Sequence, residues 1–112
     1  MSKQSIPLLV HTKKASGAVA ARRFVTATGA QAGAAANTLG VSQWAAQDGE
    51  DFPVTGLGTE VVEVGAAIAE GAAVETDAQG RAVTKAAGPT LARALQASSA
   101  AGEFIEVSLI PN

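Results

Sequence analysis

Cysteine and tyrosine are absent from the 112 residues, and histidine occurs once, as His11. Without cysteine there are no disulfides, no thiolate nucleophile and no cysteine-ligated metal, which suits a reducing compartment or indifference to redox state. General acid–base catalysis needs groups that are brought together with adjusted pKa values. A single histidine near the N-terminus offers little for that chemistry. We therefore expect a protein that is not an enzyme and that holds no metal or cofactor.

Long apolar runs are absent as well. The run from Ile6 to Val10 is far shorter than the ~20 residues that span a membrane. Residues 1–10 also lack a small-residue cleavage site after a proper apolar region, so they do not resemble a signal peptide. We expect a soluble protein that is made in the cytoplasm and has no membrane partner.

Aromatic residues make up only 4% of the chain, while alanine and glycine are abundant. The length is that of one domain, but small side chains form thin elements rather than a thick core. Such a domain would complete its apolar burial against neighbouring chains. We interpret this composition as a first sign of oligomerisation.

Charge is distributed unevenly along the chain. Residues 1–23 carry a net charge of +5, and the remainder carries −7, from three basic and ten acidic residues. A basic segment on an acidic body is typical of a nucleic-acid-binding tail or of an arm that docks on an acidic protein surface. The basic residues of the first segment are Lys3, Lys13, Lys14, Arg22 and Arg23.

Residues 1–16 are expected to form an extended N-terminal arm, because Pro7 disfavours helix just before it and a polar stretch follows the apolar run. Two interpretations remain open. The arm is either a partly ordered terminus or a segment that becomes ordered on a partner protein. In the second case its apolar contacts would be Ile6, Leu8, Leu9 and Val10.

Residues 17–112 are expected to form the β domain. Short apolar pieces are separated by turn signals every 8–12 residues, which predicts an all-β domain, either a small sandwich or barrel-like, with short strands. The predicted strands cover residues 22–29, 39–45, 52–55, 59–64 and 103–110, with a hairpin that joins 74–76 to 81–84. The segment Leu91–Ala97 fits a strand or a helix equally well. Residues 30–37 favour helix by composition, but they are too short to hold one alone.

Two groups of carboxylates are candidates for acid–base catalysis or metal binding. Glu60 and Glu63 lie on a predicted strand, and Asp48, Glu50 and Asp51 lie in a predicted turn. We interpret them as a solvated strand face and a polar turn. The turn lacks the ligand spacing of a calcium loop, and Gly56-Leu57-Gly58 lacks the third glycine and following helix of a phosphate-binding loop.

Nucleic acid is the main alternative partner, since Lys13, Lys14, Arg22 and Arg23 could contact phosphates. Only Phe24 is close enough in sequence to stack on bases, and the acidic body would repel the same duplex. A soluble β-barrel binding module that takes nucleic acid through the basic arm is therefore the second hypothesis.

The lone tryptophan, Trp44, has two possible roles. Tryptophan is usually a core residue, but it is also enriched among interface hot spots. Because the sequence around Trp44 is small and polar, we keep it as a candidate interface anchor.

The order of several segments resembles a known family. From residue 17 to 110 the chain carries, in this order, LGV (39–41), DGE (48–50), FPV (52–54), VGAAIAEG (64–71), TDAQGRA (76–82), ARALQA (92–97) and AGEFIEVSL (101–109). Together their order and spacing are similar to those of the capsid cement (decoration) proteins of tailed phages.

This resemblance implies a compact β domain that sits outside the icosahedral shell, binds the major capsid protein and braces the joints between capsomers. It also implies a virion component on the outer surface of the head, made in the host cytoplasm. A homotrimer is favoured and a dimer is possible. The family has no catalytic residues to transfer, and the resemblance favours strand for Leu91–Ala97. Residues 1–16 lie mostly outside the matched region.

Overall fold

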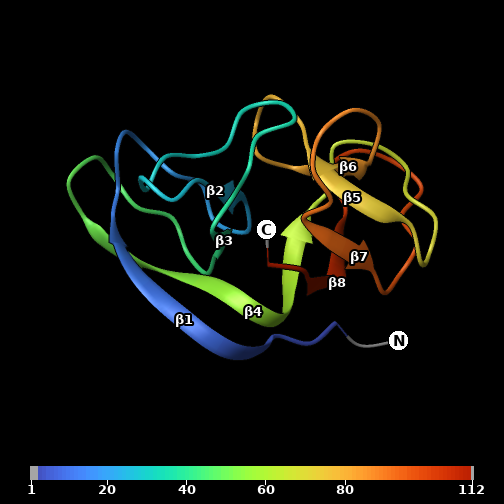
Figure 1. Cartoon of the computed structure of the whole chain (residues 1–112), viewed down its shortest axis with the longest axis horizontal. Coiled ribbons are helices and arrows are strands. Elements are labelled where there is room, and N and C mark those ends of the chain that lie inside the picture. The colour runs from blue at the N-terminus through green and yellow to red at the C-terminus, as the bar shows by residue number, and fades with distance from the viewer. Residues whose placement is uncertain (1–2, 112) are drawn as a thin grey trace.

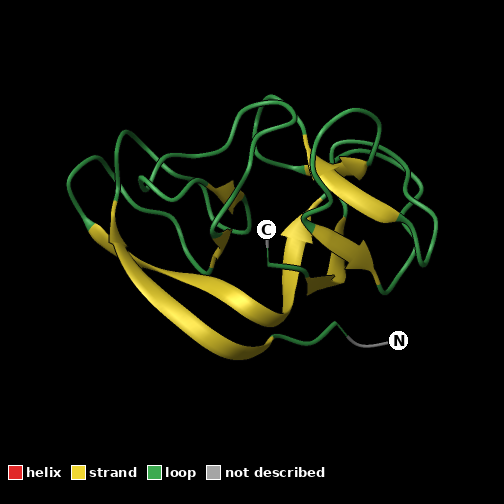
Figure 2. Cartoon of the chain, viewed as in Figure 1, coloured by secondary structure: helices red, strands yellow, loops and turns green. Residues whose placement is uncertain are grey.

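The computed structural model describes residues 3–111, and within that range strands are joined by long loops without any helix (Figure 2). No helix in this range could therefore cross a membrane. Met1 and Ser2 of the expected arm, and Asn112, lie outside the described residues. The all-β prediction is confirmed. The strands are β1 (Ile6–Lys14), β2 (Phe24–Val25), β3 (Gly40–Ser42), β4 (Asp51–Glu63), β5 (Ala73–Thr76), β6 (Ala82–Thr84), β7 (Ala92–Ala94) and β8 (Phe104–Leu109).

The strands form one antiparallel sheet in the order β2-β3-β4-β8-β7-β5-β6, with β1 paired to β4 off this path (Figure 1). Just after β4, Val64 forms a parallel bridge with Ala82 of β6. The backbone N–H of Gly65 donates to the carbonyl of Ala82 at 2.8 Å. The sheet therefore curls until its last strand meets the end of β4, which makes the domain barrel-like and nearly closed.

The longest strand, β4, explains much of this shape. Val62 and Val64 are fully buried while Val61 and Glu63 are only partly buried, as the sequence alternation predicts. Residues 52–55 and 59–64 were expected as separate strands, and that expectation is wrong, because β4 is continuous across them. Gly58 makes this possible. Its φ is 104°, and a Cβ at this position would overlap the carbonyl oxygen of Ile6.

Two clusters of buried side chains fill the domain. The smaller lies under β1 and the first part of β4, and it consists of Ala15, Val19, Val25, Ala46, Phe52 and Val54. The larger fills the barrel and includes Val62, Val74, Leu91, Ile105 and Val107. In the two-residue strand β2, Phe24 belongs to the larger cluster and Val25 to the smaller one. β2 therefore joins the two clusters by pointing alternate side chains into each.

The shorter elements confirm some predictions and correct others. The predicted hairpin is present, with Val74 paired to Thr84 and Thr76 to Ala82. Strand is confirmed within Leu91–Ala97, although only as the three residues of β7. Residues 30–37 form no helix, because their N–H groups bond to distant carbonyls, such as that of Ala35 to Thr76 at 2.9 Å.

The extended arm is not confirmed. Residues 6–14 form β1, which pairs with β4 from Ile6 opposite Thr59 to Lys14 opposite Asp51. The β4 strand is thirteen residues long and offers a complete edge for this pairing. The N-terminal segment therefore finds its backbone partners within its own chain, and it becomes an edge strand of the sheet.

Candidate protein-interaction surfaces

The outer edge of β1 is the first candidate surface. Among the described strands β1 pairs only with β4, so its other edge presents backbone groups that lack a ladder partner. Its side chains are also unusually exposed for their type: Ile6 is 50% exposed, Leu8 73%, Leu9 48% and Val10 44%. The four apolar residues expected to contact a partner therefore lie together on one exposed edge strand.

The most exposed of these, Leu8, sits at an irregularity in the pairing. The register shifts between Pro7 and Leu9 and again between Leu9 and Val10, so that Leu8 has no residue opposite it on β4. Such a bulge twists a strand locally and redirects side chains. It turns Leu8 outward at the middle of the apolar stretch.

The two lysines of β1 lie at its far end, at the start of β4. Lys13 is opposite Phe52, and Lys14 is opposite Asp51. The ammonium of Lys14 lies 3.6 Å from the carboxylate of Asp51, with both side chains about two-thirds exposed. An ion pair this exposed contributes little stability. Lys14 is therefore accessible to a partner, while Lys13 is only partly exposed.

The two arginines of the basic segment lie elsewhere and are already paired. Arg22 contacts the carboxylate of Glu60, and Nη2 of Arg23 lies 3.0 Å from that of Glu63. Both carboxylates belong to the end of β4, whereas the lysines lie at its start. The structure therefore does not bring Arg22 and Arg23 together with Lys13 and Lys14, and the charges of the arginines are compensated within the chain.

Glu60 is fully buried, so its interpretation as part of a solvated strand face is wrong. Besides its contact with Arg22, it accepts a hydrogen bond of 2.7 Å from the hydroxyl of Thr55, which in turn accepts one of 2.9 Å from the amide of Gln43. A buried carboxylate needs this kind of compensation. Glu60 is therefore a structural link between β4 and the segment that carries Arg22.

Trp44 is 58% exposed and does not fill the core. It follows Gln43, whose N–H donates to the carbonyl of Pro53, and Pro53 is opposite Thr12 of β1 on the other side of β4. The segment that carries Trp44 and the strand β1 thus flank β4 on its two edges. An exposed tryptophan in this position remains a suitable interface anchor.

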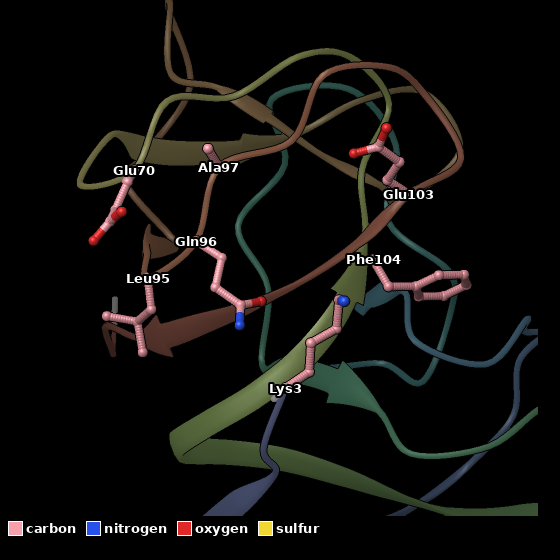
Figure 3. Close-up of a pocket in the computed structure, with 7 residues that line it drawn as sticks. All are labelled: Lys3, Glu70, Leu95, Gln96, Ala97, Glu103 and Phe104. Carbon is pink, nitrogen blue, oxygen red and sulfur yellow. The ribbon is translucent and has the colours of Figure 1, made fainter. Parts of the chain in front are cut away.

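A broad depression of about 720 Å³ forms the second candidate surface (Figure 3). The exposed apolar side chains of Leu95 and Phe104 and the carboxylates of Glu70 and Glu103 share it with Lys3. Hydrogen bonds from the hydroxyl and N–H of Ser99 lower the pKa of Glu103 below its ordinary value. These residues were not among the sites expected from the sequence. Leu95 and Phe104 are each exposed next to a buried neighbour, Ala94 and Ile105 respectively.

Neither surface contains a cluster of metal-ligating side chains among the described residues. Within residues 3–111 no group of three or more histidine, aspartate or glutamate side chains could hold a metal ion. The single histidine, His11, is partly buried, with its ring packed close to Gly56. Both surfaces expose apolar side chains beside charged ones.

Comparison with known proteins identifies the family of this chain and a similar fold. Residues 3–109 match the family model described as phage cement protein. The fold is similar to that of the crystal structure of the head fiber gp8.5 N base in bacteriophage phi29. The TM-score is 0.76 and the identity 18%, over 91% of this chain and 93% of that one. No curated protein matches. The chain belongs to the phage cement protein family, as the order of its sequence segments indicates, and it is therefore a structural protein of the phage particle.

Proposed function

We propose that this phage cement protein binds the outer surface of the major capsid lattice and stabilises the head. It would do so as a homo-oligomer, with a trimer favoured and a dimer possible, after synthesis in the host cytoplasm. The observation that carries the proposal is the exposed apolar edge of β1, with Leu8 at its centre. No catalytic role is proposed.

The open edge suits a lattice partner for a physical reason. A strand or extended loop that meets an unpaired sheet edge gains main-chain hydrogen bonds, and alternate side chains provide specificity. On a capsid, each copy that binds also faces many equivalent neighbours, so modest contacts add up through a high effective concentration. A small domain without a deep pocket can therefore bind a shell firmly.

In this proposal three groups of residues have different roles. The apolar contacts come from β1, and Trp44 adds a second anchor across β4. Lys14, with the partly exposed Lys13, supplies positive charge at the end of the strand. Arg22 and Arg23 act within the domain, because they contact Glu60 and Glu63. This pairing also gives the nucleic-acid hypothesis no specific support, and we do not propose it.

The test uses heads that lack the protein and adds purified protein back. Leu8→Asp places a charge on the exposed edge and leaves both buried clusters intact, so it should reduce co-sedimentation with heads by on the order of tenfold or more. Ala78→Asp is the matched control, because it adds the same charge in the exposed turn between β5 and β6. The control should bind as the unaltered protein does.

Heat resistance of the heads provides a second readout. Heads that carry the unaltered protein or the control should survive a higher temperature than bare heads, and heads mixed with Leu8→Asp should not. Equal binding by Leu8→Asp and the control would overturn the role of the β1 edge. Equal heat resistance of bare and coated heads would overturn the cement function itself.

A further inference from the structure

The backbone groups of β1 alternate between the two sides of the strand, and two hydrogen bonds show which residues face β4. The N–H of Ala15, just after β1, donates to the carbonyl of Glu50 at 2.7 Å, so Ala15 faces β4. The carbonyl of Pro53 accepts from the N–H of Gln43 at 3.1 Å, on the far side of β4 from its partner Thr12. Opposite residues in an antiparallel pair alternate between exchanging both hydrogen bonds and exchanging none. Thr12 therefore directs its N–H and carbonyl away from β4.

Val10 has the same orientation as Thr12, because it lies two residues earlier and no register shift separates them. Outside the β1–β4 pairing, no backbone-to-backbone hydrogen bond of the described residues involves either of them. Lys14 also faces outward, but Gly29 lies so close that a Cβ there would overlap the Lys14 carbonyl oxygen. The open edge therefore presents two complete pairs of backbone donor and acceptor, those of Val10 and Thr12.

The first half of β1 cannot extend this pattern. Pro7 has no N–H to donate, and the register shifts on both sides of Leu9 make the edge irregular. At the other end, Ala15 is buried and faces β4. A further strand can therefore pair regularly only along the five residues Val10–Lys14.

The side chains of this stretch define the chemistry of the strand that would pair with it. Val10 and Thr12 are exposed, whereas His11 and Lys13 are partly buried. Both exposed side chains are β-branched, and such residues pair well across strands with β-branched or aromatic side chains. The two positions that bond to Val10 and Thr12 cannot be proline, because proline lacks the N–H.

We propose that an extended segment of the major capsid protein adds to β1 as a further strand, through the N–H and carbonyl groups of Val10 and Thr12. This inference rests on the proposed function and deepens it, since it specifies main-chain pairing along one half of the β1 edge. Leu8, on the same edge, would add a side-chain contact where regular pairing ends.

The short length of the regular edge favours a shell segment over a second copy of the chain. Pairing along five residues buries far less than the roughly 1,200 Å² of a stable interface, so two copies in solution would not stay joined through it. A shell presents many equivalent segments, and short contacts then add up through effective concentration. β1 lies on the outside of the β1–β4 ribbon, where such a segment can reach it (Figure 1).

Proline substitution tests the main-chain contact. Thr12→Pro removes an N–H that points away from β4, a position where an edge strand tolerates proline, so the pairing with β4 should remain. Thr12→Ala is the matched control, because it removes the side chain and keeps the N–H. Co-sedimentation with heads that lack the protein should be weaker for Thr12→Pro than for Thr12→Ala by on the order of tenfold. Thermal unfolding would verify that both variants are folded.

Hydrogen exchange provides a measurement that needs no substitution. In the free protein the amides of Val10 and Thr12 should exchange much faster than those of His11 and Lys13, whose groups face β4. On heads, exchange at Val10 and Thr12 should slow by on the order of tenfold or more, while His11 and Lys13 stay protected. The exchange is quenched on the heads and read residue by residue after release of the protein.

The outcomes separate this inference from the cement function. Binding to heads without slower exchange at Val10 and Thr12, or equal binding by folded Thr12→Pro and Thr12→Ala, would overturn the strand addition and leave the function standing. Protection of Val10 and Thr12 in the free protein that disappears on dilution would mean that a second copy occupies the edge, which also contradicts the inference. Failure of the unaltered protein to bind heads would overturn both.

Discussion

The two ends of this domain differ in whether the edge of the sheet is paired or left open. At one end β4, β8, β7, β5 and β6 curl until Val64 bridges Ala82, so the larger cluster is enclosed. At the other end β1 and the first part of β4 form a ribbon over the smaller cluster of six buried side chains, of which Phe52 is the largest. β1 is left open on its outer side, where its aliphatic side chains are exposed. The closed end carries most of the buried apolar side chains, while the open end leaves apolar side chains exposed.

The comparison is sharpest for one pair of leucines. Leu91 is 2% exposed in the closed end, whereas Leu8 is 73% exposed on the open edge. Leu91→Ala should lower the free energy of unfolding by about 2–5 kcal/mol, through lost burial and the cavity that remains. Leu8→Ala should change it by less than about 0.5 kcal/mol and should instead weaken attachment to heads. Urea unfolding and co-sedimentation measure the two effects, and equal losses of stability would contradict the division.

A glycine substitution should break the open end alone. Gly58→Ala places a Cβ against the Ile6 carbonyl and 2.9 Å from the Leu8 nitrogen, at a φ of 104°. The positive φ alone costs about 1–3 kcal/mol, and the overlap must also displace β1. Hydrogen exchange should show lost protection in β1 but not in β8. Gly71→Ala is the control, because its φ is 87° but nothing lies within 4 Å of the new Cβ. It should show the strain without the loss of protection in β1.

Glu60 links the end of β4 to the segment that carries Arg22. Glu60→Gln keeps the shape of the side chain but places an amide where Arg22 needs a carboxylate. The free energy of unfolding should fall by about 1–3 kcal/mol, less than for a fully buried pair because Arg22 is partly exposed. Glu50→Gln, in the exposed turn before β4, should alter it by less than about 0.5 kcal/mol. Similar effects at both positions in chemical unfolding would mean that the buried pair adds no stability.

The smallest expected effect concerns acid. The N–H groups of Ala86 and Gly88 each donate to the carboxylate of Glu75 at 2.8 Å, which lowers the pKa of Glu75 below its ordinary value. Since the folded pKa is the lower one, this stabilisation is complete at neutral pH. It is lost as the pH falls below about 4.3, the pKa of an unfolded glutamate, and through the lowered value. Glu75→Gln should therefore flatten part of the acid side of the stability curve, measured by urea unfolding from neutral to acid pH. An unchanged slope would contradict this contribution.

The sequence predicted best where alternation alone determines burial. Val62 and Val64 in β4 face inward, and Ile105, Val107 and Leu109 in β8 do the same. The same alternation also places Glu60 on the inward face, two residues before Val62. Its burial could not be expected from the sequence, because an unpaired buried carboxylate is costly and its partner Arg22 is far away in the sequence.

The sequence predicted least where long-range pairing decides. In the sequence the basic residues of 1–23 form one positively charged segment. In the structure Arg22 and Arg23 contact the end of β4, whereas Lys13 and Lys14 lie at its start. The N-terminal segment was predicted to be an arm because the sequence does not indicate that β4 continues through Gly58 and so provides an edge for it to pair with. The depression brings together residues from three distant parts of the chain, Lys3, Glu70 and 95–104, and no local pattern marks such a site.

The irregular pairing at Pro7 and Leu8 also affects how readily the exposed edge could stack with other copies. A long, flat and aliphatic edge strand recruits further copies of itself and leads to aggregates. Proline and a bulge are devices that interrupt such open-ended stacking, because the edge is then neither flat nor continuously able to donate hydrogen bonds. In this protein Pro7 and Leu8 lie within the exposed apolar edge of β1 and also make that edge irregular. The exposed apolar strand of this protein is thus interrupted by two features that oppose open-ended stacking of copies.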